Sequence, residues 1–298
     1  IPTVSRAAPV HKFIILGVSL MESAKLRTAF SLFLSYGVCL LVLVIVTYPV
    51  LWMFMGSLKE SWEVIARPFS PPLYPSLENY VEAWRVARFG RAFVNSILVT
   101  AFSLAGILLV STMGGYAFAK LDFLGKDFLF YFWLIGMMVP SHVSLIPNFI
   151  VFDRLHLIDS YFALFLIYLS GTSFGVFIMR SFFFTVPTEI LEAARIDGCS
   201  EFGAFWRVAL PLARGGLAVI AIFYFVYLWN DFVYPLTFLR STKMNTVPLA
   251  LMIFRGRWTA DWGPLFAALS MASLPPLVFY FFFQKQFVRG LTAGALKG

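Results

Sequence analysis

Six windows of the sequence are each long enough to cross a bilayer and almost free of charged residues. A helix that spans the hydrocarbon core needs roughly 20 apolar residues. The one Asp, Glu, Lys or Arg within these windows is Asp231, in the fifth. Because 60% of the 298 residues are hydrophobic and 13% are charged, the chain has too little polar surface for a soluble domain of its size. The sequence therefore predicts an all-α, polytopic membrane protein with six transmembrane helices. These helices are expected at approximately 29–55, 92–119, 128–152, 160–179, 215–239 and 263–284.

The distribution of Lys and Arg predicts the orientation of these helices. An even number of spans places both termini on the same side of the membrane. With that side inside, thirteen Lys and Arg fall in cytoplasmic segments and ten in outer loops. Cytoplasmic loops carry an excess of positive charge, so the sequence favours N-in and C-in. The net charge of +8 is split between two membrane faces and forms no single phosphate-binding surface, so no nucleic-acid partner is expected.

The chain is expected to contain one membrane domain, residues 25–298, after an N-terminal cytoplasmic segment, residues 1–24. The apolar piece FIILGVSL in this segment is too short to span a bilayer. Three interpretations of the first twenty residues remain open. They form a helix on the membrane surface, a truncated signal-like segment, or sequence that precedes a natural start at Met21.

A charged stretch at 185–211 separates the fourth and fifth predicted spans and is expected to form two short helices. Pro187 suits the start of the first helix, and Gly198 can adopt the left-handed conformation that ends it. Ser200 is a candidate N-cap of the second helix, which is expected to end at Pro211. The second helix carries apolar residues at the i, i+3, i+4, i+7 spacing of a single stripe. The stripe consists of Phe202, Phe205, Trp206 and Ala209.

The first of these short helices has the features of a docking surface. Ala193 and Ala194 leave room for another surface to approach closely. Glu192 and Asp197 offer carboxylates that an arginine of a partner could bind. The residues themselves are also compatible with an amphipathic hairpin that lies on the membrane surface.

Several stretches of the chain resemble one family of membrane proteins. EAARIDG, followed by Val208 and Leu210-Pro211, resembles the EAA loop of permease subunits in binding-protein-dependent ABC importers. Two positions depart from the usual pattern, because Cys199 replaces a small Ala and Val208 replaces Ile. Further stretches are similar to the smaller permease of the maltose-type carbohydrate subfamily. They are GGYAFAKLDFLGKD (114–127), MVPSHVSLIPNFIVFDRLHLIDSYFALFL (138–166), FGVFIMRSFFFTVPTEILEAARIDG (174–198) and GLTAGALKG (290–298).

The resemblance implies a type I ABC importer permease fold and a location in the cytoplasmic (inner) membrane of a bacterium or archaeon. It implies that the loop at 185–211 seats in a cleft of a homodimeric cytoplasmic ATPase. It also implies that, within the C-terminal tail at 285–298, residues 290–298 reach between the two ATPase subunits. The other implied partners are a second EAA-bearing permease subunit, an extracytoplasmic saccharide-binding protein and membrane lipid. The residues implied to contact the ATPase are Glu192, Ala193, Ala194, Asp197, Gly198, Phe202, Phe205 and Trp206.

The sequence contains no motif for binding ATP or for catalysis. A phosphate loop needs G-x-x-x-x-G-K-[ST], and the one Gly-Lys pair, Gly125-Lys126, lacks the preceding glycine. Zinc-protease, paired-cysteine and nucleophile-elbow patterns are also absent from the sequence. We therefore expect no catalytic residue, metal or cofactor in this chain, and expect ATP and Mg²⁺ to bind to the partner ATPase.

The fifth predicted span carries a polar and aromatic cluster near its outer end. Aromatic rings stack on sugar rings, and amide and carboxylate groups bond to sugar hydroxyls. A carboxylate at membrane depth is a functional candidate. Alternatively, the cluster is part of an interfacial aromatic belt, with Asp231 solvated or paired with Arg240. His142, in the third span, is either a satisfied bundle histidine or a ligand. The predicted substrate path consists of Tyr227, Trp229, Asn230, Asp231 and Tyr234.

The charge of the outer loops bears on the substrate. Their ten basic and eight acidic residues, counting Asp231, give a net charge of 10 − 8 = +2. This permits an anionic saccharide such as an oligouronate like alginate, whose approach Arg85, Arg88 and Arg91 could assist. The same arginines could instead form a rim that faces lipid headgroups.

Two other classes of protein remain as alternatives to a permease subunit of an importer. A self-sufficient secondary transporter or channel usually needs several ionisable groups within the membrane, and this sequence offers Asp231 and His142. The remaining class is an enzyme or scaffold that merely uses a membrane bundle.

Overall fold

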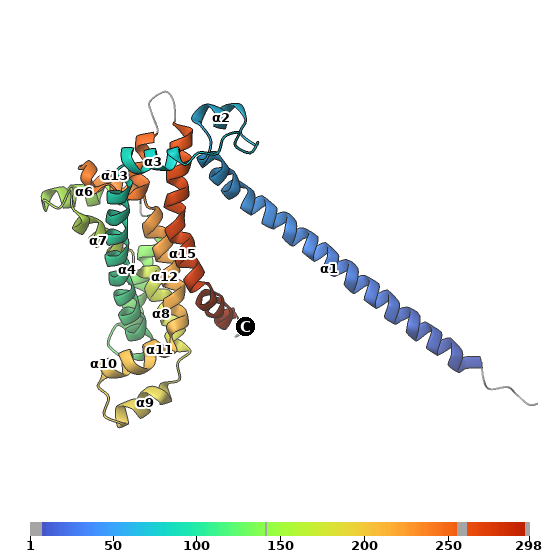
Figure 1. Cartoon of the computed structure of the whole chain (residues 1–298). Helices are drawn as coiled ribbons and strands as arrows, with labels where there is room; N and C mark the ends of the chain where they lie inside the picture. Colours follow the sequence, from blue (N-terminus) through green and yellow to red (C-terminus); the bar gives the residue numbers. More distant parts are fainter. Residues whose placement is uncertain (1–7, 141, 255–260, 296–298) are drawn as a thin grey trace, which may run out of the picture. The chain divides into compact units, whose positions relative to one another are not determined.

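The computed structural model describes residues 8–140, 142–254 and 261–295, with side chains from residue 31 to residue 286. Every regular element in this part of the chain is helical (Figure 1). The chain divides into two units, with the boundary between Met55 and Gly56.

The first unit is formed by one long helix, α1 (Ala8–Ser57), which runs just past the boundary between the units. Its part Ser31–Ser57 is long and apolar enough to cross a membrane, as predicted for 29–55. The helix is continuous from Ala8, so no break in the helix separates residues 8–24 from this span.

The second unit begins with two short helices at one of its ends (Figure 1). These are α2 (Ser61–Ala66) and α3 (Glu78–Val86). The prolines predicted to favour turns lie between them, in residues 67–77, where the backbone is not helical.

Two long helices form the frame of the second unit, and each contains a predicted span. α4 (Phe89–Lys120) contains the second span, and α15 (Trp262–Ala295) contains the sixth. Both are long and apolar enough to cross a membrane, α15 between Trp262 and Gln286.

The third predicted span is broken. Residues 128–152 form α5 (Lys126–Met138) and α6 (Leu145–Arg154), and each is too short to cross a bilayer by itself. Pro140 accounts for the break, because a residue that precedes proline is disfavoured in the helical conformation. Val139 accordingly has extended dihedrals, φ −83° and ψ 116°.

The fourth and fifth predicted spans are bent or shortened. The fourth consists of α7 (Tyr161–Ser170) and α8 (Ser173–Phe184), which meet at an angle of 48°. The fifth, predicted at 215–239, ends at the C-terminus of α12 (Arg214–Asn230), and a separate helix, α13 (Val233–Phe238), follows it. Short elements complete the chain before α15. They are η2 (Thr242–Met244), α14 (Val247–Ala250) and η3 (Leu251–Phe254).

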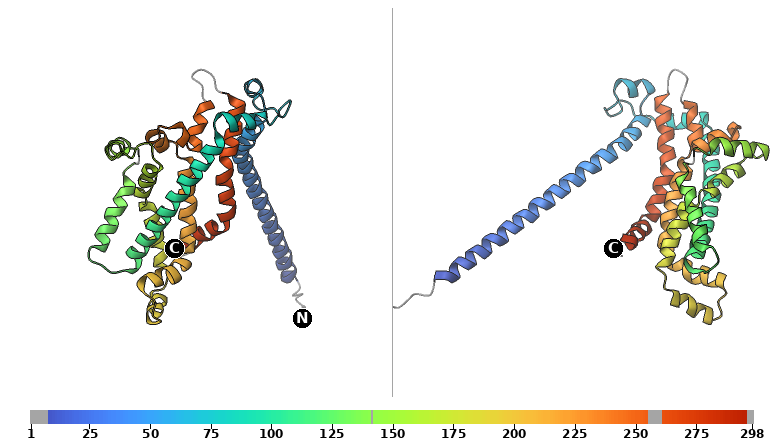
Figure 2. Two further views of the ribbon diagram at one scale, coloured as in Figure 1. Left: turned by 60° about the vertical axis from the view of Figure 1, so that its left-hand side comes forward. Right: turned by 180° about the vertical axis from the view of Figure 1, so that it is seen from behind.

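The centre of the second unit depends on a close approach of α4 to α8. A Cβ at Gly115 would lie 2.5 Å from the Cβ of Met179 and 2.8 Å from the backbone nitrogen of Arg180. A Cβ at Gly175 would lie 2.1 Å from Oγ of Ser111. Small residues therefore allow the two backbones to pack directly, as they do between many membrane helices. Figure 2 shows α4, α8 and α12 running together through the unit.

Large apolar side chains remain exposed along the long helices of the second unit. Phe102 of α4 and Phe281 of α15 are 66% and 70% exposed. Such surfaces are unsuited to water and suited to lipid, which agrees with the predicted lipid contact.

Candidate functional site

The charged stretch between α8 and α12 forms a helical hairpin at the end of the second unit opposite α2 and α3 (Figure 1). We call residues 188–212 the charged hairpin. Its helices are α9 (Thr188–Ile196), α10 (Glu201–Ala204), the π-helix η1 (Phe205–Ala209) and α11 (Leu210–Leu212). The segment Glu201–Leu212 meets α12 at an angle of 78°.

The first helix of the hairpin ends as the sequence predicts. Gly198 is left-handed, with φ +90°. Its N–H donates to the carbonyl of Arg195 at 3.0 Å, and the N–H of Cys199 donates to that of Ala194 at 2.9 Å. This pair of bonds is the Schellman motif, which satisfies carbonyls left free at a helix C-terminus.

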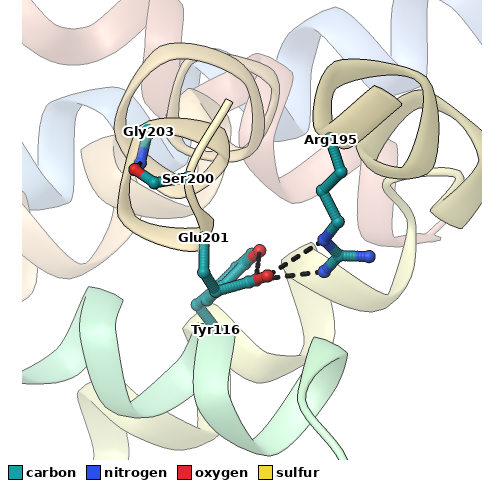
Figure 3. Close-up of polar contacts among 5 residues, drawn as sticks. All are labelled: Tyr116, Arg195, Ser200, Glu201 and Gly203. Carbon is teal, nitrogen blue, oxygen red and sulfur yellow. Dashed lines mark hydrogen bonds and ion pairs between the residues drawn. The ribbon is translucent and has the colours of Figure 1, made fainter. Parts of the chain in front are cut away.

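The second helix begins as predicted but ends later. Oγ of Ser200 accepts a hydrogen bond from the N–H of Gly203 at 3.1 Å, so Ser200 is its N-cap (Figure 3). Pro211 does not end the helical run, which continues to Leu212. The π-turn at 205–209 directly precedes α11, in which Pro211 is the second residue and Leu212 the last.

The outer surface of α9 carries most of the residues predicted to contact an ATPase. Glu192, Ala193, Asp197 and Gly198 are exposed, and Ala194 is half-buried. The helix also exposes large apolar side chains that sequence reasoning missed. Ile196 is 86% exposed and Ile190 is 44% exposed.

The apolar stripe of the second helix divides into an outer and an inner edge. Phe202 and Trp206 are 61% and 41% exposed, whereas Phe205 is 3% exposed. The Phe205 ring packs against Tyr116 of α4 and Phe183 of α8, at centroid distances of 5.1 Å and 6.2 Å. The expectation that Phe205 contacts a partner is therefore corrected, because this ring belongs to the core of the chain itself. The four positions span a wide arc of the helix, so one edge can face inward.

One carboxylate joins both arms of the hairpin to a membrane helix. Arg195 donates to Glu201 through Nε at 2.9 Å and through Nη2 at 3.0 Å, and the Tyr116 hydroxyl bonds to the same carboxylate at 2.5 Å (Figure 3). The two bonds from Arg195 lower the pKa of the Glu201 carboxyl, and bonding to Glu201 raises the pKa of Arg195. Two parallel bonds fix the geometry of an ion pair as well as its charge.

The start of the hairpin is attached to α4 at a second point. Nζ of Lys120 donates to the carbonyl of Val186 at 2.7 Å and to Oγ1 of Thr188 at 3.2 Å. Leu191 of α9 is fully buried in the main hydrophobic core. The hairpin is thus held by hydrogen bonds at its N-terminal end and by buried apolar side chains in both arms.

The polar and aromatic cluster at the outer end of α12 borders a cavity of about 530 Å³. The cavity lies where α5, α6, α7, α8, α12 and α13 meet, beside the break between α7 and α8. Of the predicted substrate-path residues, Tyr227 and Tyr234 line it. Asp231 follows the last residue of α12, and its carboxylate accepts from the Tyr168 hydroxyl at 2.6 Å and from the Val233 N–H at 3.0 Å.

Three predicted substrate-path residues, Trp229, Asn230 and Asp231, lie outside the described lining of this cavity. Trp229 is 2% exposed and donates from Nε1 to the Ala272 carbonyl of α15 at 3.0 Å, so it packs on another face of α12. The Asn230 amide donates to the Val226 carbonyl, one turn earlier, at 2.8 Å. The sequence placed these residues together because they are neighbours in the chain, but helical geometry directs neighbours to different faces.

One alternative predicted for Asp231 was a pairing with Arg240. Arg240 pairs with Asp153, at 3.8 Å, and lies over the Phe149 ring. The Asp231 carboxylate instead accepts a hydrogen bond from the Tyr168 hydroxyl.

Sequence reasoning missed Tyr224, which spans the break between α7 and α8. Its hydroxyl donates to the Gly171 carbonyl at 2.9 Å and accepts from the Gly175 N–H at 3.2 Å. A bend in a membrane helix leaves backbone groups without partners, and a neighbouring side chain can satisfy them. Gly171 and Gly175, both visible in the sequence within one span, were the available signal.

Residues 106–293 match the family described as binding-protein-dependent transport system inner membrane component. The chain belongs to this family. The predicted resemblance is therefore confirmed, and the chain is a permease, a membrane component of an ABC transporter rather than an enzyme.

Similar permeases include proteins named for saccharides. The chain is 34% identical to the arabinooligosaccharides transport system permease protein AraQ of Bacillus subtilis, over 84% of this chain and 90% of that protein. It is 32% identical to the diacetylchitobiose uptake system permease protein NgcG of Streptomyces coelicolor, over 89% and 88%. The probable ABC transporter permease protein YurM of Bacillus subtilis is 34% identical, over 87% and 86%.

A solved structure confirms the type I permease fold. The permease resembles a chain of a bacterial ABC transporter involved in the import of the acidic polysaccharide alginate, with a TM-score of 0.74 and 21% identity. The match covers 96% of this chain and 100% of that chain. At this identity the likeness establishes the fold of the permease and not its substrate.

Proposed function

We propose that this permease forms one half of the pore of an ATP-driven, binding-protein-dependent saccharide importer, and that the charged hairpin receives the ATPase. The chain would lie in the inner membrane of a bacterium or archaeon, with both termini inside. Family membership and the saccharides named in similar permeases support this proposal.

The observation that carries the proposal is the two-sided construction of the charged hairpin. Its outer side exposes the carboxylates of Glu192 and Asp197 beside the apolar side chain of Ile196. Its inner side buries Leu191 and Phe205 completely or almost completely. A surface with charges around an apolar centre is suited to a protein partner, and burial of the other side fixes that surface to the membrane helices.

The anchoring of the hairpin supplies the mechanism of coupling. When ATP closes the ATPase dimer, a docked hairpin is displaced as a body. The Glu201 carboxylate and Lys120 each join the hairpin to α4, and Phe205 packs against α4 and α8. The displacement therefore tilts these helices and changes the side on which the pore is open, and hydrolysis reverses the motion.

The remaining partners follow from the same proposal. A homodimeric ATPase binds ATP and Mg²⁺, and residues 290–298 of the C-terminal tail reach between its subunits. A second EAA-bearing permease completes the pore. A saccharide-binding protein docks at the opposite end of the second unit, where α2, α3 and α13 lie (Figure 1). One related solved structure is described as an alginate transporter in complex with a pentasaccharide-bound periplasmic protein.

The test is purification of the permease from native membranes, with the ATP hydrolysis that accompanies it as the readout. Glu192→Lys should remove the co-purifying hydrolysis, because it places a cation opposite the expected arginine of the ATPase. Glu82→Lys, the same change at an exposed position of α3, is the control and should leave hydrolysis unchanged. Equal effects of the two changes, or saccharide uptake that persists without any ATPase, would favour a self-sufficient transporter or channel.

A further inference from the structure

The cavity beside the break between α7 and α8 is walled by tyrosines held in fixed orientations. The Tyr168 ring lies 5.8 Å from that of Tyr234 and 6.3 Å from that of Tyr227, and it is nearly perpendicular to both. Tyr168 is further fixed by its bond to Asp231. Rings fixed at right angles offer a flat face and an edge, on which the C–H faces of a sugar can pack without loss of side-chain freedom.

Polar groups of α6 face the same cavity. Ser144 precedes the helix and Asn148 lies one turn later, and both line the cavity. No hydrogen bond within the described part of the chain engages the Asn148 side chain. An amide has both donors and an acceptor, so Asn148 can bond to vicinal hydroxyls of a saccharide. A few polar groups in a mostly apolar and aromatic cavity are typical of a small-molecule site, and about 530 Å³ is within the usual size range.

The cavity lacks the charge that an anionic saccharide requires. None of the sixteen described lining residues is Lys or Arg. The Asp231 carboxylate, which is hydrogen-bonded to the lining residue Tyr168, would repel a uronate. Arg85, Arg88 and Arg91, which could assist an anion outside the membrane, are exposed and do not line the cavity. A carboxylate that leaves bulk water for this cavity would find no cationic partner among these residues, which disfavours its binding.

We propose that this cavity binds an uncharged segment of the transported saccharide, with Asn148 bonding to its hydroxyls and Tyr168, Tyr227 and Tyr234 packing against its rings. This inference rests on the proposed import of saccharides and narrows the substrate to an uncharged one. It also assigns a substrate contact to this permease itself and not solely to its partner permease.

The test uses the complete complex of both permeases and the ATPase in nanodiscs, held with a non-hydrolysable ATP analogue and without the binding protein. Binding of diacetylchitobiose, arabinotriose and the anionic trimannuronate is measured by equilibrium dialysis. The unmodified complex should bind at least one uncharged probe and bind it more tightly than trimannuronate. Asn148→Leu should weaken that binding about tenfold, the usual effect of losing one or two hydrogen bonds.

Asn148→Lys should shift the preference toward trimannuronate by at least tenfold, because it adds the missing cation. Asn230→Lys is the matched control, since Asn230 is an asparagine outside the described lining of the cavity, and it should leave the preference unchanged. Preference of the unmodified complex for trimannuronate, binding of neither uncharged probe, or equal effects of the two lysine variants would overturn the proposal. If saccharide uptake depends on the ATPase but is unchanged by substitution of Asn148, the cavity assignment alone is wrong. If uptake needs no ATPase, the proposed function is wrong.

Discussion

The Tyr116 hydroxyl of α4 and the Glu201 carboxylate of α10 form a hydrogen bond of 2.5 Å between a membrane helix and the charged hairpin. Arg195 of α9 binds the same carboxylate through two nitrogens. Glu201 is therefore the point where both arms of the hairpin and α4 meet. Under the proposed coupling, transmission of motion from the hairpin to α4 should depend on this carboxylate.

Glu201→Gln should loosen the hairpin without removing the surface proposed to contact the ATPase. The neutral amide loses the ionic component of both Arg195 bonds. We expect the ATPase still to co-purify, while the number of saccharides imported per ATP hydrolysed falls several-fold in proteoliposomes. Glu189→Gln, at an exposed carboxylate in the first turn of α9, is the control. An unchanged ratio in the Glu201 variant would show that the connection to α4 is not needed for coupling.

The same ion pair predicts a pH dependence of hairpin stability. Arg195 lowers the pKa of Glu201 below its usual value of 4.5. A lowered pKa in the folded state stabilises the hairpin above pH 4.5, and this contribution is lost as pH falls through the folded-state pKa. The contribution is small because both side chains are substantially exposed. Hydrogen exchange of α9 should therefore stay slow from pH 7 to about 5 and quicken at lower pH, after correction for the intrinsic rate. In Glu201→Gln this acid step should be missing.

Gly198→Ala should destabilise the hairpin through the backbone alone. Nothing lies within 4 Å of a Cβ at this position, but φ is +90°, which an L side chain rarely adopts. The substitution should lower the stability of the hairpin by about 1 kcal/mol. Gly198→Asn should lower it much less, because Asn tolerates left-handed conformations. Proteolysis of the hairpin in the purified permease measures the effect. If the Gly198→Ala and Gly198→Asn variants were cleaved equally fast, the conformational explanation would be wrong.

Gly115→Ala should separate α4 from α8. The added Cβ would meet the backbone of Arg180 at 2.8 Å, which rotation of a side chain cannot relieve. We expect the free energy of unfolding to fall by about 1–3 kcal/mol, as in other overpacked cores. At Gly171 a Cβ would contact only the Tyr168 carbonyl, at an ordinary 3.5 Å, so Gly171→Ala should change the melting temperature much less. Similar melting temperatures for the two variants would contradict this packing.

Tyr224→Phe should weaken the junction of α7 and α8. Removal of the hydroxyl leaves the Gly175 N–H and the Gly171 carbonyl without that partner, at a cost of about 1–3 kcal/mol. The melting temperature of the purified permease should fall by a few degrees. Tyr131→Phe, at a tyrosine that is 65% exposed, should leave it unchanged. A Tyr224 variant as stable as the unmodified permease would show that the bend needs no side-chain bridge.

The sequence predicts helix ends and caps of this permease well, and contacts between different helices poorly. Gly198 and Ser200 were identifiable because left-handed glycine and N-cap serine act within a few residues of themselves. The burial of Phe205 against the chain itself was not predicted, because helical spacing shows that residues share a face but not which neighbour covers that face. Trp229 lies away from the cavity because neighbours in a helix point to different faces. The bond between Tyr168 and Asp231 joins positions 63 residues apart and has no local signal.

Photo-cross-linking from Ile196 tests the central claim most directly. This side chain is 86% exposed on the charged hairpin, and a photoreactive residue there in native membranes should cross-link to a protein that mass spectrometry identifies as an ATPase with a phosphate loop. The same residue at Tyr74, which is 84% exposed in the loop between α2 and α3, should not. Cross-linking of the ATPase from Tyr74, or from neither position, would contradict the account.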